Sequence, residues 1–122
     1  MNLDYGPATG TCDLSTTGRL SGEVCRIEIW YVVIAGEVVL TGTPGPRGWL
    51  ANLRSNPAAT LHLREPHRDV PVIAHEVTGL EERHRIAEEA GRLQPWYAEQ
   101  PYSVDDWVEG SPMVVLAPGG RA

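Results

Sequence analysis

The 122-residue sequence contains no lysine and no phenylalanine, so all ten of its basic residues are arginines. Without lysine the chain cannot form a Schiff base with a carbonyl compound, and the phosphate-binding motif ending in Lys-Ser or Lys-Thr is excluded. The formal net charge is −6, so the basic surface typical of nucleic-acid-binding domains is missing as well. We therefore predict a small-molecule substrate and no nucleic-acid partner.

Cysteines and long hydrophobic runs are also scarce. Cys12 and Cys25 lack the CxxC spacing of redox and zinc motifs, which favours free thiols. No apolar run approaches the ~20 residues of a membrane-spanning helix, and the first residues do not form a signal-peptide pattern. We predict a single cytoplasmic domain over residues 1–122, large enough for one hydrophobic core.

The residues that could bind metal or act as nucleophiles form no known motif. The histidines at positions 62, 67, 75 and 84 match no metal-ligand spacing, so we predict no metal site. Ser15, Ser21 and Ser55 are candidate nucleophiles, but none lies in a GxSxG sequence. The sequence therefore does not predict a hydrolytic Ser-His-Asp triad.

Alternating apolar and polar residues predict a mainly β domain. Val24–Ala35 begins with alternation and then becomes continuously apolar, which indicates a strand whose far end is buried on both faces. A tight turn at residues 35–37 joins it to a second strand, Val38–Thr41, as a hairpin. Further strands are predicted at Cys12–Thr17, Ala59–Leu63, Val70–Val77 and Met113–Leu116. We expect Cys12–Thr17 to be an edge strand, and Pro71 indicates either an edge or the first position for its own strand.

Helices are predicted between these strands. Thr41–Pro57 reads as a glycine-rich loop followed by a short helix that Pro57 ends. A second helix is expected to begin with a capping box of Thr78 and Glu81 and to run to about residue 93. Residues 64–69 read as a polar turn, residues 94–103 as an aromatic loop and residues 104–109 as a helical turn. Together these elements predict a small antiparallel barrel of about six strands with inserted helices.

Arginines and large aromatic residues are the remaining candidates for ligand binding. Arg47 at a helix start, beside a glycine-rich loop, suits an anion, and Arg19 and Arg26 could join it if the fold gathers them. The alternative is three independent surface arginines. The large aromatic residues at 30, 49, 96 and 97 similarly suit a flat ring ligand, although Trp49 at least suits a hydrophobic core equally well.

An ordered set of short motifs resembles the deazaflavin-dependent nitroreductase family. The set comprises STTGRLSG at residues 15–22, RIEIWYVV at 26–33, a strand ending in Thr-Gly, and WLANLRSNP at 49–57. The match extends from about Leu14 to Leu63 and is diffuse beyond. Members of this family have a six-stranded split β-barrel related to the FMN-binding, pyridoxamine phosphate oxidase-like barrels. The resemblance thus implies that fold for residues 1–122.

The same resemblance implies a cofactor and a reaction. The cofactor is coenzyme F420, a deazaflavin, and the reaction is hydride transfer from its reduced form to a quinone, a nitro compound or an enone. The family's cofactor contacts fall on Arg19, Ser21, Arg26, Tyr31, Thr41, Gly42, Thr43 and Trp49. Arg47 is added from its place at the helix start. This chain departs from many members in having Leu20 and Thr43 where they have basic residues.

Two tyrosines are the candidates for catalysis. Tyr97 and Tyr102 lie in the aromatic segment before the last strand, and their hydroxyls could donate a proton or orient the acceptor. Packing of this segment over the barrel is the structural alternative. Two other functions remain open: an FMN-dependent oxidoreductase on the same barrel, or a non-catalytic protein that binds a cofactor, haem or lipid. A homodimer is a further expectation.

Overall fold

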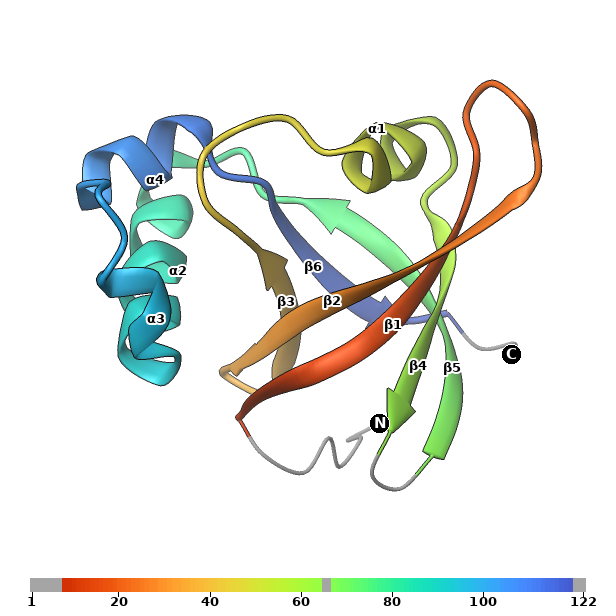
Figure 1. Ribbon diagram of the computed structural model, residues 1–122, viewed down its shortest axis with the longest axis horizontal. Coiled ribbons are helices and arrows are strands. Elements are labelled where there is room, and N and C mark those ends of the chain that lie inside the picture. The colour runs from red at the N-terminus through yellow and green to blue at the C-terminus, as the bar shows by residue number, and fades with distance from the viewer. Residues whose placement is uncertain (1–7, 65–66, 120–122) are drawn as a thin grey trace.

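The computed structural model describes residues 8–64 and 67–119, which form a closed antiparallel barrel with helices at one end and on one side. The barrel confirms the predicted fold class, and its strand order is β1-β2-β3-β6-β5-β4 (Figure 1). Its strands are β1 (Thr9–Thr17), β2 (Val24–Ile34), β3 (Glu37–Thr41), β4 (Ala58–Arg64), β5 (His67–Glu76) and β6 (Met113–Pro118).

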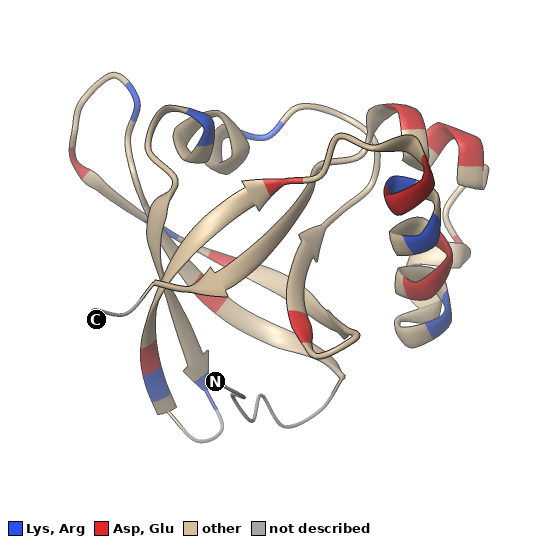
Figure 2. Ribbon diagram, turned by 180° about the vertical axis from the view of Figure 1, so that it is seen from behind, with Lys and Arg blue, Asp and Glu red and all other residues tan. Residues whose placement is uncertain are grey.

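Four helices complete the fold: α1 (Gly48–Ser55), α2 (Leu80–Leu93), α3 (Pro95–Ala98) and α4 (Val104–Gly110). α1 lies over one end of the barrel beside the β1–β2 turn, whereas α2, α3 and α4 gather on one side (Figure 1). The exposed face of α2 carries acidic and basic residues together (Figure 2). Within the described residues, no helix has the length and apolar character that a membrane crossing requires.

The hydrophobic residues form two cores, one on each side of the barrel wall. Inside the barrel, residues such as Leu14, Leu40 and Leu61 are fully buried, and α1 closes this core with Leu50 and Leu53. The second core lies between the wall and the helices, and its members are Val32, Ile34, Val39, Val77, Ile86, Ala87, Ala90, Tyr97, Trp107 and Met113. The far end of β2 is thus buried on both faces, which confirms the interpretation of its continuous apolar run.

The predicted β2–β3 hairpin is confirmed by its turn. Ala35 and Gly36 have φ angles of 53° and 80°. Two consecutive left-handed residues are the signature of the tight turn that matches the twist of paired strands. The pairing runs from Val32 opposite Val39 to Ile34 opposite Glu37.

Two predictions of edge strands are wrong, because the barrel closes. β1 pairs with β2 on one side and with β4 on the other, so the strand predicted at Cys12–Thr17 has no free edge. Pro71 lies in β5, which pairs with β4 and β6. The ladder to β6 begins at Val72, and the Pro71 carbonyl accepts a hydrogen bond from Gly119 N–H at 2.8 Å. Pro71 is tolerated because it lies just beyond that ladder.

Helix and turn boundaries also required correction. The residue preceding α2 is Gly79, without a side-chain cap, so the Thr78–Glu81 capping box is wrong by one residue in register. A capping box does occur at α4, between Ser103 and Asp106. The predicted helical turn there is confirmed, but the aromatic loop contains the single-turn helix α3. β4 and β5 extend into the predicted 64–69 turn, and its residues 65 and 66 lie outside the described residues.

Candidate functional site

The turn between β1 and β2 is fixed against α1 and presents an arginine side chain to solvent. The Arg19 N–H donates to Asn52 Oδ1 at 3.0 Å, and Asn52 Nδ2 donates to Thr16 Oγ1 at 3.1 Å. Ser21 Oγ accepts a hydrogen bond from Glu23 N–H at 3.1 Å, which shapes the turn. In the part of the chain that the structure describes, Arg19 is the arginine whose guanidinium has no hydrogen-bond or ion-pair partner. The turn therefore offers an uncompensated positive charge.

The glycine-rich loop between β3 and α1 is organised around the guanidinium of Arg47. Arg47 Nη1 donates to the carbonyl oxygens of Gly45 and Pro46 at 2.9 and 3.3 Å, and Nη2 donates to the Thr43 carbonyl at 2.8 Å. A Cβ at Gly42 would lie 2.9 Å from Arg47 Nη2. Arg47 therefore orders the loop, and Gly42 leaves it the space to do so.

Both ends of this loop are held by the segment around α4. Thr41 is buried, and its hydroxyl donates to the Pro112 carbonyl at 2.7 Å. Further along, Gly45 N–H donates to the Gly110 carbonyl at 3.0 Å. Trp49, in the first turn of α1, is half-buried and packs against the barrel core. Thr41 and Trp49 thus fix the position of the loop from its two sides.

Two of the expected cofactor contacts lie in the barrel wall. Arg26 on β2 donates through Nε to Asp13 Oδ2 at 3.0 Å, so its charge is already paired. Tyr31, also on β2, is 4 % exposed and belongs to the core inside the barrel. Burial raises the pKa of the Tyr31 hydroxyl. The structure gives both residues roles in the wall, and their contact with a cofactor stays a prediction.

Four aromatic rings connect β2 to the helices. Tyr97 contacts Trp107 and Trp30 with ring centroids 5.2 and 6.0 Å apart, and Trp96 contacts Trp30 at 5.5 Å, all edge to face. Burial raises the pKa of Tyr97 to about 12, and the positive charge of Arg47 opposes this increase.

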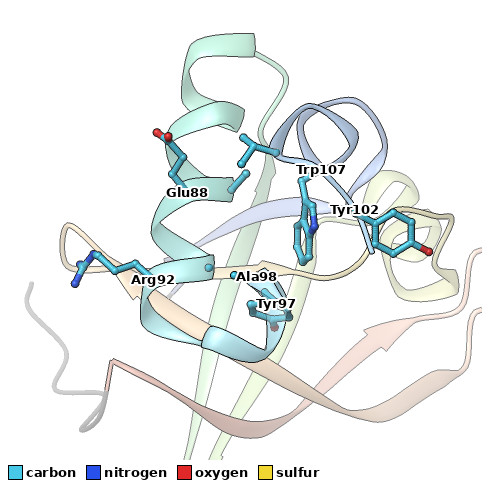
Figure 3. A pocket seen from close by; sticks show the side chains of 9 residues that line it. Glu88, Arg92, Tyr97, Ala98, Tyr102 and Trp107 are labelled. Atoms are coloured by element: carbon cyan, nitrogen blue, oxygen red, sulfur yellow. The ribbon is translucent and has the colours of Figure 1, made fainter. Parts of the chain in front are cut away.

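A pocket of 420 Å³ lies between α2, α3 and the start of α4 (Figure 3). Tyr97, Tyr102 and Trp107 line it, with Glu88 and Arg92 of α2 at its polar side. Tyr97 is almost fully buried, whereas Tyr102 is 42 % exposed, and its hydroxyl is directed away from α2 (Figure 3). The two tyrosines predicted as catalytic candidates thus share one pocket but differ in contact with solvent.

Comparison with known proteins identifies the family. The model of the F420H2-dependent quinone reductase family matches residues 7–118. This chain belongs to that family. Membership makes it an F420-dependent oxidoreductase, agrees with the fold that the motifs between Leu14 and Leu63 implied, and supports F420 as the cofactor. No curated protein matches the chain in a sequence comparison.

Solved structures confirm the fold of this family member. A conserved hypothetical protein from Mycobacterium tuberculosis has a TM-score of 0.67 at 24% identity, over 90% of this chain and 73% of its own. An F420H2-dependent reductase, FDR-A, has a TM-score of 0.63 at 22% identity, over 86% and 92%. A candidate pyridoxamine 5′-phosphate oxidase from Listeria innocua has a TM-score of 0.66 at 9% identity, over 90% and 84%.

Trp107 is the residue of this quinone reductase family member that the sequence interpretation missed. It packs on Tyr97, lines the pocket and is 5 % exposed. The signal was present: Val104, Trp107 and Val108 are spaced i, i+3 and i+4, the spacing of one helix face. A single helical turn was predicted there, but its buried face was not recognised.

Proposed function

We propose that this protein uses reduced coenzyme F420 to reduce a small organic acceptor, with a quinone as the first choice. The observation that carries the proposal is the uncompensated Arg19 guanidinium on a turn fixed against α1. A charge-assisted hydrogen bond from such a group to a phosphate contributes about 1.5–3 kcal/mol. Family membership supports F420 as the molecule that carries this phosphate.

The residues present fit such a cofactor. Arg19 and the Ser21 hydroxyl would hold the phosphate, because both are exposed on the same turn. Gly42 and Thr43 would meet the cofactor at the loop, whose shape Arg47 maintains. When bound, F420H2 supplies the hydride for the reaction. The contribution of the chain is therefore to bind and orient both reactants.

The two tyrosines would orient the acceptor and supply the proton that is added together with the hydride. Reduction of a quinone to a hydroquinone adds one hydride and one proton. Because burial raises the pKa of Tyr97 to about 12, its hydroxyl stays protonated at neutral pH and can donate a hydrogen bond to the acceptor oxygen. The Tyr102 side chain is exposed to water. We propose that Tyr97 orients the acceptor and Tyr102 delivers the proton.

Titration of the purified protein with F420H2, FMN and haem tests the cofactor assignment. We expect F420H2 to bind at micromolar concentration and Arg19→Ala to weaken its affinity about 10- to 150-fold, the equivalent of about 1.5–3 kcal/mol. Arg85→Ala is the matched control, since Arg85 pairs with Glu82 on the exposed face of α2. Tighter binding of FMN or haem than of F420H2 would overturn the proposal.

The roles of the two tyrosines are tested by separate phenylalanine variants. We expect Tyr102→Phe to lower kcat for quinone reduction and Tyr97→Phe to raise the KM for the quinone, with unchanged F420H2 affinity in both. Unchanged turnover in both variants would remove them from the mechanism. The homodimer stays a prediction, which light scattering of the purified protein checks.

A further inference from the structure

Three side chains from three different strands form a continuous hydrogen-bonded chain on the outer wall of the barrel. Ser15 Oγ on β1 lies 2.8 Å from His62 Nε2 on β4, and His62 Nδ1 lies 2.7 Å from Asp69 Oδ1 on β5. The order serine, histidine, carboxylate and the use of opposite ring nitrogens are those of a hydrolytic triad. The sequence did not predict a triad, because closure of the barrel brings together residues 47 positions apart.

The register of the strands explains why these three side chains meet. Asp13 and His62 are opposite one another in the β1–β4 ladder, and Ser15 is two residues further along the same face of β1. His62 is in turn directly opposite Asp69 in the β4–β5 ladder. Alternate residues of a strand share one face, and the side chains of Leu14 and Leu61 occupy the other, inside the barrel.

The electrostatics of the chain favour the reactive arrangement of protons. The hydrogen bond from His62 holds the pKa of Asp69 below its usual range, so Asp69 is a carboxylate at neutral pH. A carboxylate only accepts hydrogen bonds, which requires a hydrogen on His62 Nδ1. In neutral imidazole, Nε2 is then the acceptor, and the Ser15 hydroxyl donates to it. His67 Nε2 lies 3.3 Å from the same Asp69 oxygen and competes for it.

The remaining requirements are access and positive charge. Ser15 is half-buried and the Asp69 side chain is 54 % exposed, whereas His62 is 9 % exposed and therefore held in place. Arg26 is directly opposite Ser15 in the β1–β2 ladder and adds its positive charge to the field at Asp69. Facing positions of neighbouring strands have Cβ atoms about 5 Å apart, so Arg26, which is also paired with Asp13, lies beside Ser15.

We propose that Ser15, His62 and Asp69 form a second reactive site, at which Ser15 is acylated or phosphonylated by activated esters. Ser15 Oγ forms a bond to the carbonyl carbon or phosphorus atom, and the bond to the leaving group breaks. The Ser15 proton passes to His62 Nε2 and then to the leaving group. Water releases an acyl group by the reverse proton movements. The site is distinct from the Arg19 turn and from the pocket of Tyr97 and Tyr102.

The test is labelling of the intact protein with a fluorophosphonate probe at neutral pH, followed by mass spectrometry of its peptides. We expect one adduct, on Ser15, formed as the P–O bond replaces the P–F bond. Ser15→Ala should abolish the adduct, and His62→Gln should slow labelling about 10²-fold, the contribution of a general base. Asp69→Asn should slow it as well, because the imidazole loses its orienting carboxylate.

Ser55→Ala is the matched control, because Ser55 is an exposed serine at the end of α1. We expect this variant to be labelled at the wild-type rate. Thermal unfolding checks that each variant is folded. If His62→Gln is unstable, Asp69→Asn tests the same hydrogen-bonded chain, because Asp69 is largely exposed. Absence of an adduct on Ser15, or an adduct that forms equally fast without His62 or Asp69, would overturn the proposal.

Discussion

The barrel wall and the helical side of the molecule use arginine in different ways. In the wall, arginines pair with carboxylates across the strands: Arg64 bonds both Asp13 and Glu28, and Arg26 bonds Asp13. The backbone groups of these strands are already paired in the ladders. The arginines of the wall therefore bond carboxylate side chains, and these ion pairs lie at the surface.

Outside the wall, Arg83 and Arg47 bond backbone carbonyl groups instead, whereas Arg85 and Arg92 on the surface of α2 pair with carboxylates. Arg83 donates to the carbonyls of Val77, Val108 and Ser111 at distances between 2.5 and 2.9 Å. Arg47 does the same for the β3–α1 loop. These carbonyl groups lie at the ends of strands, helices or loops, where no neighbouring strand supplies a backbone donor. The arginine side chain supplies the hydrogen bond instead. The candidate cofactor and substrate residues depend on this second type of support.

The largest effect is expected from truncation of the barrel core, which both regions share. Leu40→Ala removes a fully buried side chain, so we expect the free energy of unfolding to fall by about 2–5 kcal/mol. Leu80→Ala, at a 72 % exposed position, should change it by less than about 0.5 kcal/mol. Urea denaturation measures both. Equal effects of the two variants would contradict the burial of Leu40 inside the barrel.

Removal of the Arg83 guanidinium tests the support of the helical side. Arg83→Met leaves three carbonyl groups without their donor, so we expect a loss of about 2–4 kcal/mol in the free energy of unfolding. Arg85→Met is the matched control on the same helix, and its exposed ion pair should contribute less than about 1 kcal/mol. A loss no larger than that of the control would remove the distinction between the two uses of arginine.

Most strands of the barrel could be predicted from the sequence, because strand alternation and turn residues are patterns of neighbouring positions. Strand alternation and the tight turn at Ala35 and Gly36 show two elements and their connection directly. The continuous apolar end of β2 indicated burial at that end, and Val32 and Ile34 there do pack in the second core beside the helices. Closure was not visible, because the pairing of β1 with β4 joins segments that no short motif connects. Both errors about edge strands follow from that.

The site was only partly predictable, since a motif shows which residues matter but not their partners. The motif around Arg19 predicted a ligand contact at this turn, but nothing in it showed that Asn52 would hold the turn or that the guanidinium would stay unpaired. Arg47 was interpreted as an anion ligand from its place before a helix. The structure shows that loop carbonyls occupy its Nη atoms instead. Hydrogen-bond partners that are distant in the sequence can be identified only once the barrel structure is known.

A smaller effect is expected at Arg47, where the bonding of loop carbonyl groups by an arginine can be related to cofactor binding. In Arg47→Met the carbonyls of Thr43 and Gly45 lose their donor, and we expect about 1–2 kcal/mol less stability because the loop is partly exposed to water. F420H2 affinity should fall with it, since the loop carries Gly42 and Thr43. Arg85→Met, which removes an exposed pair with Glu82, is the control. Full affinity in Arg47→Met would show that the loop shape is not needed for binding.

The smallest effect is expected where the two regions meet, at the Glu76 carboxylate that ends β5. Arg54 donates to both of its oxygens, at 2.8 and 2.6 Å, and Arg83 adds a weaker attraction. The hydrogen bonds from Arg54 lower the pKa of Glu76 below its ordinary value of 4.5. A lowered pKa in the folded state stabilises the protein above pH 4.5, and this contribution disappears as the pH falls through the folded value.

Glu76→Gln should therefore lose less stability than the wild-type protein on acidification below that pH. Because Arg54 is 60 % exposed, the difference at neutral pH should be below about 1 kcal/mol. Thermal unfolding from pH 7 to pH 3 measures the two profiles, and Arg54→Met should reproduce the shallower one. If the profiles of the wild-type protein and both variants coincide, the bidentate pair contributes nothing, and the wall and the helical side are joined by their shared hydrophobic core alone.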